Sequence, residues 1–301
     1  MASGIARPPL RSMLFVPGNR TEWLPKAVAA GADAVVLDLE DAVAEADRPA
    51  ATERVAAAVA AAAEPATALF VRIPPLDDWP AAARLRAVAR TGLAGVVLPK
   101  VSDAEQVRLA DRLLGWCEQE HGLPPGTFAL VPLLETARGL RSAFEIAGAV
   151  PRVGYAGALT APGGDVERAV GYRWSPEGTE TRELRSRVLL DVRAAGVAHP
   201  VGGLWTRIAD LTGLRAFAEQ NRALGYAGMM AIHPSHVPVI NEVFSPSAAE
   251  LARCARLVAA VAAGRAAGSG AVAFEGEMVD EAMAATARAL LARHGGGSAG
   301  P

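Results

Sequence analysis

The sequence predicts a (β/α)8 (TIM) barrel with a C-terminal helical extension. Eight short apolar runs alternate with stretches rich in Ala, Arg and Glu that have helical spacing, and the runs recur roughly every 30 residues. Most runs are apolar throughout, which is typical of parallel strands covered on both faces. No Gly-x-Gly-x-x-Gly motif follows the first run, so the competing architecture, a doubly wound open sheet with a dinucleotide site, lacks support.

The expected strands are recognised by where each apolar run stops. The first run, SMLFVPG, stops at a glycine, and the second, DAVVLDLE, stops at a carboxylate. The third, fourth and fifth lead to Arg72, Lys100 and Glu135, the seventh is the poorest, and the eighth leads into IHP. In chain order the runs cover residues 12–18, 33–40, 68–73, 95–101, 128–135, 152–159, 197–204 and 228–234.

The pattern divides the chain into a barrel domain and an extension. The barrel is predicted over residues 10–246. A helix over 249–263, a turn-like AVAFEGEMVD segment and a helix over 281–293 then form an extension, 247–294, that we expect to contact a neighbouring subunit. Residues 295–301 contain too little apolar surface to order themselves, so we expect a disordered tail.

Composition excludes several classes of protein. The chain has 301 residues, 51% of them hydrophobic, which is enough for a sizeable core. Its 30 Lys and Arg residues against 32 acids give no basic field, so nucleic acid is not an expected partner. The sequence shows neither a signal peptide nor a spanning apolar run, so we expect a cytoplasmic protein without membrane contact. Cys117 and Cys254 are expected to be reduced structural thiols.

Charged residues at the strand ends form the candidate site, because catalytic groups of a barrel collect at its C-terminal rim. Arg72 and Glu135 each end a buried run and need partners. Glu135 suits magnesium, which takes one or two carboxylates plus water and substrate oxygens, and Arg72 suits a substrate carboxylate. The alternative for both residues is a salt bridge that joins neighbouring strands.

A second group of rim residues is expected to support that site. Glu40 and Asp41 follow the second run, and Asp38 points the same way as Glu40 because side chains alternate along a strand. These carboxylates can order metal-bound water or pair with rim cations, of which Lys100 is one. Purely structural roles are the alternative for all four.

Six strings strengthen this interpretation. In order, RSMLFVPGNR, DAVVLDLEDAV, LFVRIPPLDD, GVVLPKV, LLETARGL and IHPSHVPVINEVFSPS resemble the citrate lyase β-subunit/malyl-CoA lyase family, which has HpcH/HpaI aldolase-type barrels, and FEGEMVD resembles its C-terminal element. The resemblance implies a barrel that uses magnesium to cleave, form or hydrolyse CoA thioesters of short hydroxy- or keto-diacids. It also implies a homotrimer or homohexamer.

The resemblance also implies roles for individual residues. Arg72 is expected to bind substrate, and Glu135 to bind both metal and substrate. Arg20 and Lys26 match positions that approach CoA phosphates, the alternative being ordinary solvated charges. Asp280 matches an acid that relatives insert into a neighbouring subunit's active site, the alternative being a helix N-cap before the last helix.

Several positions depart from the family pattern. Thr160 stands where the family usually has the aspartate that completes the metal site. Asp165 is therefore the candidate second ligand, with the flexible stretch 162–164 giving it room to approach. Pro74 and Met229 replace a usual asparagine and lysine, and Gly202–Gly203 stands near a missing aspartate. These changes leave the fold intact but put the chemistry in question.

Three functions follow as hypotheses. The leading one is a magnesium-dependent carbon–carbon lyase that acts on a short β-hydroxyacyl-CoA such as malyl-CoA or citramalyl-CoA. The second is an acyl-CoA thioesterase that uses the same site. The third is an acyl-CoA-binding barrel that has lost its metal and its catalysis. The sequence does not specify the acyl chain or the keto acid.

Overall fold

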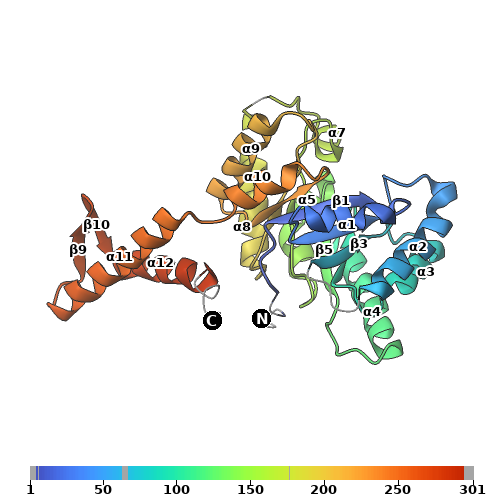
Figure 1. Ribbon diagram of the computed structural model, residues 1–301, viewed down its shortest axis with the longest axis horizontal. Helices are drawn as coiled ribbons and strands as arrows, with labels where there is room; N and C mark the ends of the chain where they lie inside the picture. The colour runs from blue at the N-terminus through green and yellow to red at the C-terminus, as the bar shows by residue number, and fades with distance from the viewer. Residues whose placement is uncertain (1–4, 6, 63–66, 176, 295–301) are drawn as a thin grey trace. The chain divides into compact units, whose positions relative to one another are not determined.

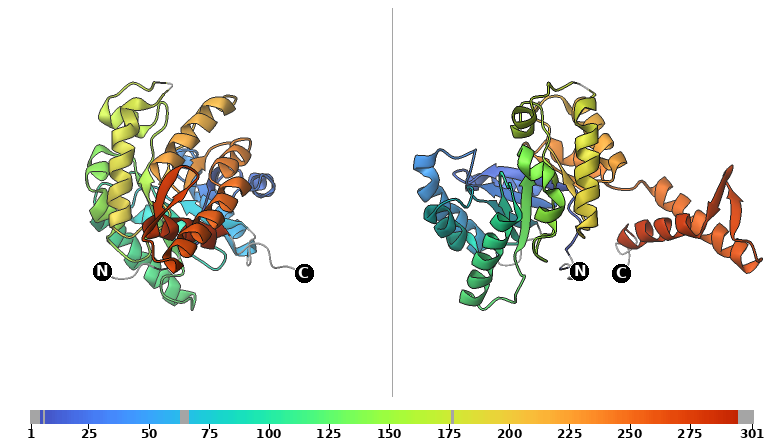
Figure 2. Two further views of the ribbon diagram at one scale, coloured as in Figure 1. Left: turned by 90° about the vertical axis from the view of Figure 1, so that its left-hand side faces the viewer. Right: turned by 180° about the vertical axis from the view of Figure 1, so that it is seen from behind.

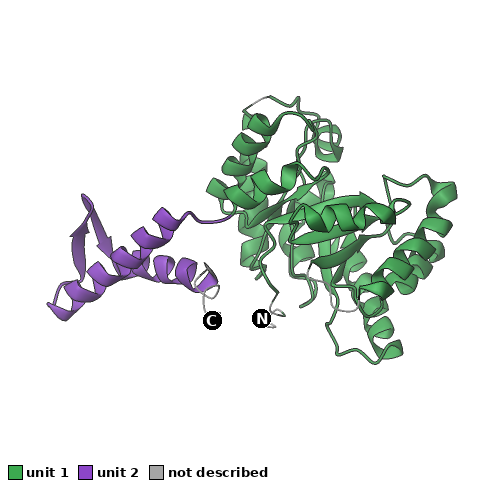
Figure 3. Ribbon diagram, in the orientation of Figure 1, with its two compact units in different colours: residues 1–244 green, residues 245–301 purple. Residues whose placement is uncertain are grey.

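The computed structural model describes residues 5, 7–62, 67–175 and 177–294, so the predicted tail 295–301 lies outside the described residues. The chain divides into two compact units, residues 1–244 and 245–301 (Figure 3). Among the described helices, none combines the length and the apolar character that crossing a membrane requires. Cys117 and Cys254 are both free thiols.

The first unit is a barrel of eight parallel strands, as predicted. The strand order is β6-β5-β4-β3-β2-β1-β8-β7. The amide of Val201 donates to the carbonyl of Ala156 at 3.1 Å, which brings the two ends of this order together. The strands are β1 (Ser12–Pro17), β2 (Ala34–Asp38), β3 (Ala68–Arg72), β4 (Gly95–Leu98), β5 (Ala129–Leu134), β6 (Gly157–Ala158), β7 (Val201–Gly202) and β8 (Gly228–Ala231).

Helices surround the strands of this unit (Figures 1 and 2). They are α1 (Leu24–Ala29), α2 (Arg48–Ala61), α3 (Trp79–Val88), α4 (Ala104–Glu120), α5 (Ala137–Arg141), α6 (Ala143–Ala147), α7 (Asp165–Val170), α8 (Arg182–Ala194), α9 (Leu211–Leu224) and α10 (His236–Val243). Three 3-10 turns, at Thr21–Trp23, Glu45–Asp47 and Thr179–Thr181, precede α1, α2 and α8.

Alternate residues of the strands enter two different cores. Val36 of β2 and Phe70 of β3 belong to one buried apolar cluster, whereas Leu37 and Val71, their neighbours in sequence, belong to another that includes the helices. One strand face therefore lines the barrel interior and the other packs against the helices. This explains why the runs are apolar on both faces.

The sixth and seventh strands are much shorter than their predicted runs. Backbones approach closely there: a Cβ added to Gly157 would lie 2.1 Å from the carbonyl oxygen of Val201, and one added to Gly203 would lie 1.8 Å from that of Thr160. Glycine is required at both positions because no side chain fits. Regular pairing is confined to two residues in each strand, in agreement with the poor apolar pattern of the seventh run.

The second unit contains α11 (Ala248–Ala266), β9 (Ala271–Phe274), β10 (Glu277–Asp280) and α12 (Glu281–His294). Both expected helices are present. The AVAFEGEMVD segment is more than a turn, because its two arms pair as an antiparallel hairpin. Glu275 and Gly276 form the bend with φ of 49° and 85°. Leu257 and Val261 of α11 share a small core with Val279.

Helix α4 offers a test of local stability away from the site. Asp103 precedes the helix, and its Oδ1 accepts hydrogen bonds from the amides of Glu105 (3.1 Å) and Gln106 (3.2 Å). We expect Asp103→Ala to lower the free energy of unfolding by about 1 kcal/mol, because two amides lose their cap. Urea denaturation measures this. Asp103→Asn should retain most of the stability, and equal losses in both variants would contradict the capping role.

Candidate active site

The alternation of the strands directs several predicted residues into one mouth of the barrel. Asp38 and Arg72 have the same parity as Val36 and Phe70, which line the interior, and both close their strands. Glu135 follows β5 with the parity of interior Leu133. The carboxyl ends of parallel strands meet at one rim, so these side chains converge there.

Arg72 is held by the carboxylates that follow β2. Its Nε and Nη2 donate to the two oxygens of Asp38 at 2.7 and 2.6 Å, and its Nη1 lies 3.0 Å from Glu40 Oε2. The guanidinium carbon lies 4.8 Å from the ring centroid of Phe15. A guanidinium has five N–H donors, so Asp38 fixes one edge and leaves donors on Nη1 and Nη2. Arg72 is oriented before any substrate arrives.

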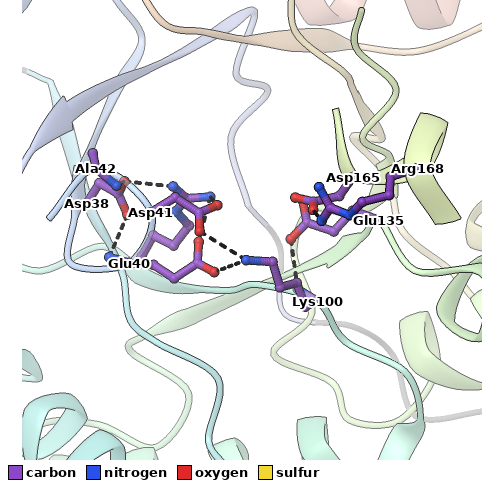
Figure 4. A network of polar contacts seen from close by, with 9 residues as sticks. Asp38, Glu40, Asp41, Ala42, Lys100, Glu135, Asp165 and Arg168 are labelled. Carbon is purple, nitrogen blue, oxygen red and sulfur yellow. Dashed lines mark hydrogen bonds and ion pairs between the residues drawn. The ribbon is translucent and has the colours of Figure 1, made fainter. Parts of the chain in front are cut away.

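Lys100 connects the two halves of the site (Figure 4). Its Nζ contacts Glu40 and lies 3.0 Å from Asp41 Oδ1, while its backbone amide donates to Glu135 Oε1 at 2.8 Å. Burial disfavours the ammonium, but the bonds to Glu40 and Asp41 outweigh this and raise the pKa of Lys100. The residue adopts a positive φ of 52°, which is uncommon outside glycine.

Glu135 is the most perturbed acid of the site. It is only 4% exposed. Burial raises its pKa to about 7, although the Lys100 amide and the Arg72 charge oppose the shift. Perturbed pKa values cluster at functional sites, so this buried carboxyl group is a candidate for a functional role.

Asp165 lies beside Glu135, as Figure 4 shows, and its charge contributes to the raised pKa of Glu135. It is the first residue of α7, and Arg168 of the same helix forms an ion pair with it. Gly163, with a φ of 70°, precedes the helix and permits the turn that brings Asp165 to the rim. The loop therefore provides the approach that the sequence suggested.

Thr160 supplies a hydroxyl in place of the carboxylate of the usual aspartate. Its side chain is fully buried, and its hydroxyl is one of the buried polar atoms without a hydrogen-bond partner within the described residues. Of the other departures, Met229 is a buried residue of the core that packs against the helices, and Gly202 belongs to β7.

Arg20 and Lys26 lie at a different part of the same rim. Arg20 is exposed, pairs with Glu22 at 3.3 Å, and has its guanidinium carbon 5.1 Å from the ring centroid of Trp23. Lys26 is exposed on α1 and lines a cavity of about 290 Å³ between the ends of β1 and β8, together with Trp23 and His233. An apolar cavity with a lysine at its edge suits a long ligand that carries phosphates.

Asp280 belongs to the second unit. It is exposed, and its Oδ1 accepts hydrogen bonds from the amides of Ala282 (3.0 Å) and Met283 (3.2 Å). It therefore begins α12 as an N-cap, which was the alternative interpretation. This contact occupies one carboxylate oxygen and leaves the other available.

A family model for HpcH/HpaI aldolase/citrate lyase matches residues 11–234, which is most of the chain. The chain belongs to this family. The match confirms the resemblance read from the sequence motifs, and it covers every strand of the HpcH/HpaI barrel.

Relatives in the HpcH/HpaI family match almost from end to end. The citrate lyase subunit beta-like protein of Deinococcus radiodurans is 41% identical over 290 residues, covering 94% of this chain and 96% of that protein. The (3S)-malyl-CoA thioesterase of Cereibacter sphaeroides is 32% identical over 285 residues, covering 95% and 94%. A crystal structure of CitE from Mycobacterium tuberculosis with magnesium, acetoacetate and coenzyme A has a TM-score of 0.73 at 34% identity, covering 95% of this chain and 98% of that chain.

The residues present fit a magnesium ion of the kind expected for the HpcH/HpaI family. Among the described residues no group of three or more His, Cys, Asp or Glu side chains is arranged to hold a metal. Magnesium does not need one, since it commonly takes one or two carboxylates and fills its other positions with water and substrate oxygens. Glu135 and Asp165 supply two adjacent carboxylates, whose mutual repulsion a divalent cation would relieve.

Two contacts of the HpcH/HpaI site were missed by the sequence reasoning. Arg168 pairs with Asp165, and the spacing of three residues on one helix was a usable signal. Phe15 lies against Arg72, and its parity with interior Met13 on β1 was also available. His233, the histidine of the IHP string, lines the cavity beside Lys26.

Proposed function

We propose that this protein is a magnesium-dependent carbon–carbon lyase that acts on a short β-hydroxyacyl-CoA such as malyl-CoA or citramalyl-CoA. The observation that carries the proposal is the buried carboxylate of Glu135 with the half-buried carboxylate of Asp165 beside it, near a fixed Arg72 at the mouth of the barrel. This arrangement offers a cation site next to an anchor for a substrate carboxylate.

In this proposal Glu135 and Asp165 hold the metal. Magnesium, when bound, supplies Lewis acidity to a substrate oxygen. The Lys100 amide fixes the Glu135 carboxylate through Oε1 and leaves Oε2 for the ion or the substrate. The fixed geometry lowers the entropy that the site loses when its ligands assemble.

Arg72 orients the acyl substrate. Its remaining Nη donors bind the carboxylate, and Asp38 and Glu40 keep the guanidinium plane from rotating. Arg72 also stabilises the negative charge on the alkoxide oxygen that forms when the substrate hydroxyl loses its proton. Asp38, Glu40, Asp41 and Lys100 thus position the arginine and the metal-binding acid, and they do not react themselves.

The thioester end of the substrate is assigned to the cavity between β1 and β8. Lys26, which lines this cavity, and Arg20, which lines a separate hollow with Asn19 and Arg54, bind the CoA phosphates, and the apolar wall beside Trp23 covers part of the carrier. Cleavage transfers the hydroxyl proton to water, converts the C–O bond to a carbonyl, breaks the carbon–carbon bond and leaves its electron pair on the enolate carbon of the acyl-CoA. Asp280 of a neighbouring subunit then protonates that carbon in a homotrimer or homohexamer.

Thioester hydrolysis is the second candidate, favoured by the 32% identity to a malyl-CoA thioesterase over 285 residues. A barrel that binds acyl-CoA without catalysis is the third, favoured by the buried Thr160 in place of a ligand. The three differ in products, since only the lyase forms acetyl-CoA and a keto acid, and hydrolysis releases free CoA.

The test is product analysis with purified full-length protein, magnesium and malyl-, methylmalyl- and citramalyl-CoA. We expect a keto acid and a shortened acyl-CoA in equal amounts from at least one substrate, and no product with EDTA. Free CoA without a shortened acyl-CoA would replace the lyase by the thioesterase. Turnover of none of the three thioesters would contradict both enzymes and favour the binding barrel.

A further inference from the structure

Arg168 forms an ion pair with Asp165, one of the two carboxylates of the candidate metal site. It lies three residues after Asp165 on α7, and its Nη2 donates to Asp165 Oδ1. Within the described residues Asp165 is its only ion-pair partner. The side chain of Arg168 is 75% exposed and that of Asp165 is 22% exposed, so the guanidinium reaches the acid from the solvent side.

The contact between these two residues can break without disturbing the barrel. Helix α7 has six residues and lies between Gly163 and Gly171, whose φ values are 70° and 86°. Arg168 is exposed and pairs with its partner across a single helical turn, an arrangement that contributes little to stability. Leaving Asp165 therefore costs Arg168 little.

Arg168 lies beside the site because the second carboxylate, Asp165, is supplied by the same helix. At residue 160, directly after the sixth predicted strand, the chain has a buried threonine rather than an acid. The carboxylate comes instead from the start of a helix whose next turn carries an arginine. Without a metal, this arginine partly neutralises Asp165, which otherwise repels Glu135.

We propose that Arg168 is an internal counter-cation that competes with magnesium for Asp165 and thereby lowers the affinity of the site for the ion. The inference rests on the proposed function in that it takes Glu135 and Asp165 as the metal ligands. When magnesium binds, Arg168 releases Asp165 and turns to solvent. Arg168 is a positioning residue here, since it acts through Asp165.

The test is isothermal titration calorimetry of magnesium chloride into the full chain without substrate. Arg168→Ala is expected to bind magnesium about two- to fivefold more tightly than the wild type, the range that an exposed ion pair supports. Arg168→Gln, closer in size, should show the same gain, and Arg168→Lys should stay within about twofold of the wild type. Arg173→Ala, at an exposed arginine of the following loop, is the matched control and should change nothing.

A double-mutant cycle separates direct competition from the general effect of removing a positive charge. Asp165→Asn should weaken magnesium binding, and adding Arg168→Ala to it should then give no gain, because the two residues no longer interact. A gain of the same size in the Asp165→Asn background would overturn the proposal, as would equal affinities of the wild type and Arg168→Ala. In both cases magnesium still binds and the proposed function stands. Tighter binding by Arg168→Ala without turnover of any thioester would contradict the proposed function alone, and no binding by any variant would contradict both.

Discussion

Glu135→Gln is expected to lower kcat/KM for the acyl-CoA substrate by about a thousandfold. The change removes the more buried of the two carboxylates that hold the metal, and Lewis-acid stabilisation of this kind contributes several kcal/mol to the transition state. The side-chain amide oxygen of this variant can still accept the hydrogen bond from the Lys100 amide, so the loop geometry is retained. Steady-state kinetics measures the loss of kcat/KM, and isothermal titration calorimetry measures the accompanying loss of magnesium affinity.

The matched control is Glu145→Gln, at an exposed glutamate on α6, which should leave both quantities unchanged. If Glu135→Gln retained both magnesium binding and turnover, Glu135 would not be a ligand. Loss of turnover with unchanged magnesium affinity would limit Glu135 to substrate binding.

The same variant should alter the dependence of stability on pH. The pKa of Glu135 is raised from its ordinary value of 4.5 to about 7 by burial. The folded state therefore holds a proton that the unfolded state releases, and the wild type loses stability as pH rises from about 4.5 to about 7. The difference between wild type and Glu135→Gln should grow over this window by about 3 kcal/mol in favour of the variant. Urea denaturation at several pH values, without magnesium, measures it.

Arg72→Ala is expected to lower the free energy of unfolding by about 3–5 kcal/mol and to abolish turnover. Asp38, which is 1% exposed, would lose the cation that compensates its burial, and Glu40, which is 2% exposed, would keep only Lys100. Arg72→Lys keeps the charge but not the two-pronged contact with Asp38, so we expect partial recovery of stability and a raised KM. Chemical denaturation and kinetics on both variants give the measurement.

Arg141→Ala, at an exposed arginine on α5, is the control for Arg72 and should be neutral. Asp38→Asn in the Arg72→Ala background should recover part of the stability, because one unpaired buried charge is then removed. Equal stability of Arg72→Ala and the wild type would show that the arginine is not needed to compensate these acids.

Most of the barrel could be predicted because its strands are continuous apolar runs. The runs that contain β2 and β5 have every strand residue buried, so their hydrophobicity is a direct signal of position. The seventh run was the weakest signal, and the strands β6 and β7 have two residues each. At Gly157 and Gly203 the backbone lies close to the backbone of a distant segment. Such a contact between distant segments leaves no periodicity in the sequence, so the length of these strands could not be predicted.

The candidate site was also predictable only in part, because the contacts among its side chains join segments that are distant in the sequence. Arg72 and Glu135 stand out because a charge at the end of an apolar run must find a partner. The arrangement of partners was not readable: the sequence left open whether Glu40 pairs with a cation or orders water, and the structure places it between Arg72 and Lys100. The approach of Asp165 depends on a loop conformation that residue types permit but do not specify.

Lys100 also bears on how this site can be redesigned. Its backbone amide donates a hydrogen bond to Glu135, and its ammonium group donates to Glu40 and Asp41. The left-handed backbone conformation of Lys100 allows one residue to make contacts in both directions. A lysine moved to a neighbouring strand end would restore the charge but not the amide. A glycine at position 100 would keep the amide and relax the backbone but remove the charge. A transplant of this active site into another barrel must therefore carry the turn after β4 as a whole, together with its side chain.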